Sequence, residues 1–122
     1  METILFFDGA CEGNGTPEAR AFWGWIAQQG GRDLARAYGA VDKDMVQTNN
    51  TGEYSALVSG LAGLADLRAR GQDLGAVIVK GDSQLVINQA RGVWAVGAAH
   101  LAPLCERARA LAQAVGVTAW EW

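Results

Sequence analysis

The fold is decided by the N-terminal stretch Ile4-Leu5-Phe6-Phe7-Asp8-Gly9-Ala10-Cys11-Glu12-Gly13-Asn14-Gly15. Its apolar and aromatic beginning is typical of a buried strand, which we predict over residues 3–7. We expect this strand to end at Asp8, before a glycine-rich turn. Open α/β sheets bind their ligands at the carboxyl ends of strands. Asp8 is therefore the first candidate for a functional carboxylate.

Length and composition favour one domain over residues 1–122. The chain has 122 residues, of which 50% are hydrophobic, and this is enough for one core. No apolar run is long enough to cross a bilayer, and the N-terminus lacks the basic and apolar regions of a signal peptide. We therefore expect a soluble, cytoplasmic protein with no membrane partner. Cys11 and Cys105 are too few for a disulfide scaffold, so we expect reduced thiols.

The charge balance is mildly acidic. With 10 basic and 13 acidic residues the net charge is −3. Such a balance argues mildly against nonspecific binding of nucleic acid, which depends on basic patches. Acidic residues that surround bound cations would distort the count, so charge alone does not decide the class of function.

Hydrophobic periodicity predicts the element order β-β-β-α-β-α-α-β. The expected strands cover residues 3–7, 22–29, 33–40, 76–79 and 117–122, and the expected helices cover residues 48–70, 83–91 and 101–115. Gly30-Gly31 indicates a hairpin between the second and third strands. We predict an α/β fold with a mixed five-stranded sheet and helices packed on it. The first three strands are expected to be antiparallel, and the fourth and fifth to be parallel to the first.

This topology brings three carboxylates together. Asp8 and Asp82 follow neighbouring parallel strands, and Glu53 lies in the first turn of the long helix that crosses between them. Three clustered carboxylates repel one another unless a cation or a proton neutralises them. Hard divalent ions take oxygen ligands, and Mg²⁺ is the natural choice. The sequence therefore predicts a site for divalent metal at this edge of the sheet.

Each carboxylate also has an ordinary structural explanation. Asp8-Gly9 is a common turn signal. Glu53 has the spacing of a capping partner for Asn50. Asp82 has the position of an N-cap for the short helix after it.

Three motifs, in this order and at these separations, give the chain a resemblance to the type 1 ribonuclease H family. They are Phe7-Asp8-Gly9-Ala10-Cys11 with Gly13-Asn14, Thr48-Asn49-Asn50 with Glu53, and Gly81-Asp82-Ser83-Gln84-Leu85-Val86. The resemblance extends from Ile4 to Trp122. It implies a ribonuclease H-like fold and a metal-dependent endonuclease that hydrolyses the RNA strand of RNA–DNA hybrids.

The resemblance also implies how the carboxylates work. Two metal ions about 4 Å apart clamp the scissile phosphate, one activating water and the other stabilising the leaving oxygen. Asp8 would bridge both ions, and Glu53 and Asp82 would complete the second site. Mg²⁺ is the expected ion, with Mn²⁺ as a substitute.

Substrate contacts follow from the resemblance as well. Amide side chains that donate and accept suit the 2′-hydroxyl of RNA. By resemblance this role falls to Asn14, Asn49, Asn50 and Gln84, together with the backbone near Cys11, while Thr48 would hold a DNA phosphate. A plain polar turn is the alternative for Asn49-Asn50.

Trp94 matches the tryptophan that follows the short helix in the family, and a core anchor is its alternative role. The basic residues that usually follow it are replaced here by Ala95-Val96-Gly97-Ala98-Ala99. We therefore expect weak binding of the hybrid with a shallow dependence on salt.

The sequence departs from the family at its C-terminal end. The family has a fourth metal-ligand aspartate after the last strand, and this chain ends at Trp122. A shortened form, a natural member that completes its site otherwise, and a relative that never cleaves all remain open. Glu121 is a conceivable substitute ligand, whereas His100 does not match the family's histidine and is expected at the surface. An uncovered last strand makes a monomer or a weak homodimer the expected state.

Two other functions compete with the nuclease. The first is a catalytically silent module that binds hybrids without cutting them. The second is another nuclease of the same fold, such as an exonuclease or a resolvase. The amides of Asn49, Asn50 and Gln84 argue against this second alternative, because they suit a 2′-hydroxyl.

Overall fold

A computed structural model describes residues 1–122 and contains five strands and three helices. In chain order they are β1 (Glu2–Glu12), β2 (Arg20–Gln29), β3 (Arg32–Ala40), α1 (Asn49–Ala69), β4 (Ala76–Lys80), α2 (Gln84–Ala90), α3 (Ala102–Val115) and β5 (Val117–Glu121). The predicted element order is confirmed. None of the three helices is long and apolar enough to serve as a membrane span.

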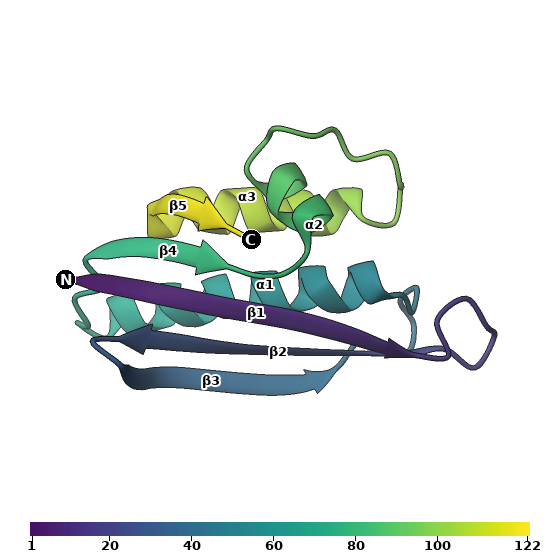
Figure 1. Cartoon of the computed structure of the whole chain (residues 1–122), viewed down its shortest axis with the longest axis horizontal. Coiled ribbons are helices and arrows are strands. Elements are labelled where there is room, and N and C mark those ends of the chain that lie inside the picture. The colour runs from purple at the N-terminus through teal and green to yellow at the C-terminus, as the bar shows by residue number, and fades with distance from the viewer.

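The strands form a single mixed sheet in the order β3-β2-β1-β4-β5. β1 pairs antiparallel with β2 and parallel with β4, β2 pairs antiparallel with β3, and β4 pairs parallel with β5. Figure 1 shows the sheet as one layer, with α1 and α3 behind it. The predicted arrangement of antiparallel and parallel strands is confirmed.

The core lies between the sheet and the helices. Along β1, Thr3, Leu5 and Phe7 are buried, whereas Phe6 and Asp8 on the other face are exposed. This period of two is the normal geometry of a strand that buries one face. α1 fills the other side of the core with Leu57, Leu61 and Leu64, each fully buried, as are Tyr54 and Ala56 on the same helix.

β1 is longer than we predicted, and the expectation that it ends at Asp8 is wrong. It continues to Glu12, because β2 is long enough to pair with it from Gln29 back to Arg20. The parallel pairing with β4, in contrast, stops at Phe6. Asp8 therefore lies inside a strand but just beyond the last residue that pairs with β4.

Candidate active site

The strand register places Asp82 beside Asp8. Phe6 is the partner of Lys80 in the last parallel pair of β1 and β4. Asp8 lies two residues beyond Phe6 in β1, and Asp82 lies two residues beyond Lys80, just after the end of β4. The carboxylates meet because two neighbouring parallel strands run in register up to this point.

Glycine allows the start of α1 to come close enough to add Glu53. A Cβ atom on Gly9 would lie 2.2 Å from the backbone nitrogen of Glu53. A Cβ atom on Gly52 would lie 2.6 Å from the carbonyl oxygen of Phe22. Side chains do not tolerate such distances, so the helix can reach the sheet here only because both positions are glycine. Gly9 and Gly52 are thus required for the close approach of α1 to the sheet that brings Glu53 to Asp8.

The three carboxylates form one cluster, with ligand oxygens that lie within 4.8 Å of one another. Asp8 and Asp82 are exposed, whereas Glu53 is 8% exposed. Burial, with the negative charges of Asp82 and Asp8, raises the pKa of Glu53 from an ordinary 4.5 to about 8, against a smaller opposing effect of a backbone hydrogen bond from Gly9. The Oε2 atom of Glu53 is buried and has no hydrogen-bond partner.

These features fit a divalent cation. A buried carboxylate oxygen without a donor is costly, and so are three acidic side chains at this separation. A metal ion removes both costs, because it supplies positive charge and accepts oxygen ligands. Asp8, Glu53 and Asp82 are the residues that would hold it.

The ordinary explanations for the three acids are wrong in this structure. Asp8 and Gly9 lie in β1 and form no turn. The N-cap of α1 is Thr48, whose capping-box partner is Thr51, so Glu53 does not cap the helix. The N-cap of α2 is Ser83, whose hydroxyl accepts a hydrogen bond from the backbone of Val86, so that Asp82 is left free of this role.

The structure places the other predicted substrate residues around the same end of the sheet. Asn14 is exposed in the turn after β1, Cys11 is half-buried in β1, and Thr48, Asn49 and Asn50 begin α1. The Thr48 hydroxyl accepts a hydrogen bond from the backbone of Thr51 at 3.1 Å. Gln84 is exposed in the first turn of α2, directly after the Asp82-Ser83 pair.

Trp94, His100 and Glu121 all lie outside the three-carboxylate cluster. Trp94 is 42% exposed in the loop between α2 and α3, so the alternative of a core anchor is wrong. His100 is exposed in a turn before α3, as expected. Glu121 lies 3.5 Å from the Nζ atom of Lys80 and does not belong to the three-carboxylate cluster.

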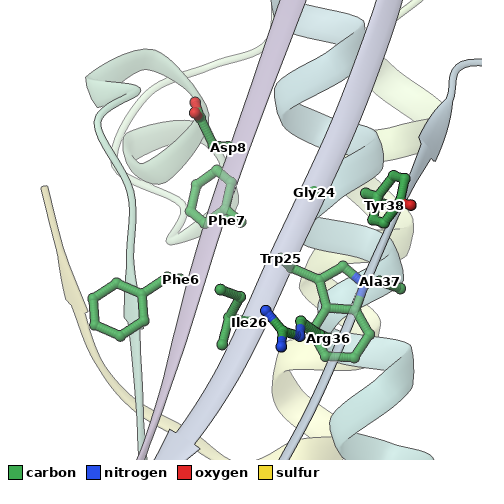
Figure 2. A pocket seen from close by; sticks show the side chains of 9 residues that line it. All are labelled: Phe6, Phe7, Asp8, Gly24, Trp25, Ile26, Arg36, Ala37 and Tyr38. Carbon is green, nitrogen blue, oxygen red and sulfur yellow. The ribbon is translucent and has the colours of Figure 1, made fainter. Parts of the chain in front are cut away.

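A shallow hollow of about 430 Å³ adjoins the cluster on the sheet face opposite the helices. Figure 2 shows Phe6 of β1 and Ile26 of β2 beside it, with Asp8 at one end and Tyr38 of β3 at the border. Asp8 is the only acidic residue among those that line it. The hollow makes the Asp8 carboxylate reachable from a mostly apolar face, on which Arg36 is the only basic residue of the lining.

Two polar residues that no sequence motif indicates, Gln47 and Gln89, support the site. Gln47 stabilises the segment before α1, because its side chain accepts from the backbone of Ala21 at 2.7 Å and donates to the carbonyl of Asp42 at 2.8 Å. Gln89 accepts a hydrogen bond from the Tyr54 hydroxyl at 2.7 Å, and Tyr54 directly follows Glu53. A polar residue at a buried helix position is the only sequence signal that points to Gln89.

Comparison with known proteins agrees with this geometry. The family model described as reverse transcriptase-like matches residues 6–122. Ribonuclease HI of Halobacterium salinarum is 36% identical over 94 residues, which is 73% of this chain and 40% of that protein. A bifunctional protein of Mycobacterium tuberculosis is 33% identical over 122 residues, all of this chain and 31% of that protein. The chain thus spans well under half the length of these relatives.

Solved structures share the fold over almost the whole chain. Ribonuclease H1 of Halobacterium salinarum superposes with a TM-score of 0.76 at 33% identity, covering 99% of this chain and 83% of that one. The N-terminal ribonuclease H domain of the Mycobacterium tuberculosis protein gives 0.80 at 29% identity, covering 100% and 86%. LC11-RNase H1, solved with an RNA/DNA hybrid, gives 0.82 at 23% identity, covering 99% and 85%.

The element order and the arrangement of the five strands thus agree with the fold of the matching structures. The chain belongs to the reverse transcriptase-like family and has the fold of type 1 ribonuclease H.

Proposed function

We propose that residues 1–122 form a single ribonuclease H-like domain that hydrolyses the RNA strand of RNA–DNA hybrids in a metal-dependent endonuclease reaction. The observation that carries the proposal is the cluster of Asp8, Glu53 and Asp82, whose ligand oxygens lie within 4.8 Å of one another. The 36% identity to ribonuclease HI supports it, and the same fold holds an RNA/DNA hybrid in LC11-RNase H1.

The metal would be bound by the carboxylates of Asp8, Glu53 and Asp82. Two Mg²⁺ ions, or Mn²⁺ in their place, would supply an activated water and stabilise the charge that develops on the phosphate. Asp8, on β1, would be the ligand that both ions share, a role that rests on the resemblance to the type 1 ribonuclease H family. Glu53 is fixed by burial, so that its unpartnered oxygen is presented to the site rather than to solvent.

The substrate is recognised by groups around this cluster. Asn14, Asn49, Asn50 and Gln84 offer amides to 2′-hydroxyls, with the backbone near Cys11. Thr48 keeps its place as the N-cap and is available at the helix start to a DNA phosphate. Trp94, exposed on its loop, offers an aromatic face to the hybrid.

Two further features of the protein are proposals of the same kind. We propose a monomer or a weak homodimer, because β5 is a short edge strand with one partner. The runner-up function is a module of the same fold that binds hybrids and does not cut them.

The test uses an end-labelled RNA–DNA hybrid and the purified protein. The hybrid is incubated with Mg²⁺, with Mn²⁺ and with chelator, beside the matched variant Asp8→Asn. We expect internal cuts in the RNA strand that require metal and are lost, by about 10²-fold or more, in Asp8→Asn. Asp33→Asn, an acid on β3 away from the cluster, serves as the control and should cut like the wild type.

The outcomes separate the candidates. Binding of the hybrid without any cut would favour the silent module. Cuts that persist in Asp8→Asn would remove the support for a metal site at this cluster. Cuts that proceed only from the RNA ends would favour an exonuclease.

A further inference from the structure

Gln89, at the end of α2, makes hydrogen bonds to three other parts of the chain. Its side-chain oxygen accepts from the Tyr54 hydroxyl of α1 at 2.7 Å. Its side-chain nitrogen donates to the carbonyl of Ala95 at 3.4 Å. Its backbone carbonyl accepts from Arg109 of α3, at 3.0 Å from Nε and 2.7 Å from Nη2. Gln89 is only 5% exposed, so these bonds replace contacts with water.

The same turn of α2 also holds the segment that carries Trp94. The backbone nitrogens of Val93 and Trp94 donate to the carbonyl of Asn88, at 2.8 and 3.0 Å. In Figure 1 this segment begins the long loop between α2 and α3. Trp94 itself is exposed and makes no side-chain hydrogen bond, so its position depends on these backbone contacts and on Ala95. The backbone hydrogen bonds to Asn88 thus fix the first residues of the loop, while Val96 and Ala98 farther along it pack against the core.

Tyr54 links this network to the acidic cluster. It follows Glu53 directly in α1, and it is fully buried. The donor from Tyr54 orients the Gln89 amide, because the amide oxygen points to the hydroxyl and the nitrogen then faces Ala95. Through Gln89, the segment that carries Trp94 is therefore held in a fixed position relative to α1, the helix that carries Glu53.

We propose that Gln89 is a positioning residue, which fixes the Trp94 segment relative to the three-carboxylate cluster and so sets how tightly the RNA–DNA hybrid is held. The inference rests on the proposed function for its substrate. It assigns Gln89 no contact with the hybrid or with metal. Its effect is therefore expected in KM for the hybrid, with little change in kcat.

The experiment compares Gln89→Met with Tyr54→Phe and with the double variant Tyr54→Phe/Gln89→Met. Methionine fills a similar volume without hydrogen bonds, and it leaves the buried Tyr54 hydroxyl without a partner, which lowers stability. The double variant removes both polar partners and should regain most of that stability. We expect KM to rise about fivefold in Gln89→Met, as for loss of one typical hydrogen bond, and to stay raised in the double variant.

A second comparison uses Trp94→Ala as the background. If Gln89 acts through the Trp94 segment, Gln89→Met changes KM little once Trp94 is absent, because the two substitutions are then coupled. If both KM and stability return to the wild-type values in the double variant Tyr54→Phe/Gln89→Met, the inference is overturned. Equal effects of Gln89→Met in both backgrounds, or a fall in kcat at unchanged KM, would also overturn it.

Amide hydrogen exchange in the free protein gives a readout that does not need activity. We expect the amides of Val93 and Trp94 to exchange about fivefold faster or more in the double variant, at wild-type stability. Unchanged protection there overturns the positioning role. If the wild type cuts no hybrid, the proposed function fails, while the exchange rates still decide whether Gln89 fixes this segment.

Discussion

Glu53 shows how the fold gives a single side chain unusual chemistry. One of its oxygens has no hydrogen-bond partner, and the chain buries it beside two other carboxylates. A carboxylate in this setting gains more from a cation than an exposed one, because it has already lost its water. Asp8 and Asp82 remain exposed, so that a cation can reach the cluster from solvent.

The stability of the metal-free protein should depend on the protonation of Glu53. Because its folded pKa is about 8 and its ordinary pKa is 4.5, the folded state binds the extra proton between these values. Stability is therefore full below about pH 4.5 and falls as pH rises through about 8. Urea unfolding in chelator across this range measures the effect. Glu53→Gln is the matched control and should lack this decline, and an equal decline in both proteins would contradict the prediction.

At the scale of elements, the site depends on how closely α1 crosses β1 and β2. Thr48 and Thr51 begin the helix with a capping box, at the point where the chain arrives from β3. Gly52 then meets the carbonyl of Phe22, and Gly9 meets the backbone of Glu53. Backbone contacts thus set the distance between α1 and the sheet. A small change in this distance would move the carboxylate of Glu53 relative to that of Asp8.

Gly9→Ala should damage the site while the rest of the sheet persists. A Cβ atom 2.2 Å from the Glu53 nitrogen forces α1 away from β1. We expect a loss of about 1–3 kcal/mol in unfolding free energy and about 10²-fold in metal-dependent cleavage. Denaturant unfolding and the cleavage assay measure the two effects. Gly97→Ala is the control, because a Cβ there meets nothing within 4 Å, and a similar loss in that variant would contradict the explanation.

At the scale of the whole molecule, net charge would limit how the proposed substrate, an RNA–DNA hybrid, is held. The chain carries a net charge of −3, and the residues that follow Trp94 are alanine, valine and glycine, none of which is charged. The helices cover one face of the sheet, and the other face carries the apolar hollow beside Asp8. Recognition should therefore depend on amides, on Trp94 and on bound metal more than on phosphate contacts.

The salt dependence of hybrid affinity tests this. With few phosphate contacts, a plot of log affinity against log salt should have a slope of about −2. Fluorescence anisotropy of a labelled hybrid at several salt concentrations, with metal held constant, gives the slope. Alanine at Arg91, an exposed cation at the end of α2, should make the slope less steep by about one if it contacts a phosphate. A wild-type slope of about −6 or steeper would show that many ion contacts had been overlooked.

Much of the fold could be predicted from the sequence because the patterns that define it are local. The apolar run from Ile4 to Phe7, the Gly30-Gly31 hairpin and the spacing of leucines in α1 depend only on neighbouring residues. The sequence also predicted that Asp8, Glu53 and Asp82 come together, because the order of the elements follows from these local patterns.

Only the tertiary structure decided the features that depend on distant partners. β1 runs past Asp8 because β2 is long enough to pair with it, which no pattern within β1 reveals. The backbone approach at Gly9, the orphaned oxygen of Glu53 and the bond from Tyr54 to Gln89 join segments far apart in the chain. The sequence by itself thus determined which groups are present and in which elements. Their burial, spacing and partners came from packing, because these depend on contacts that form only when the whole chain folds.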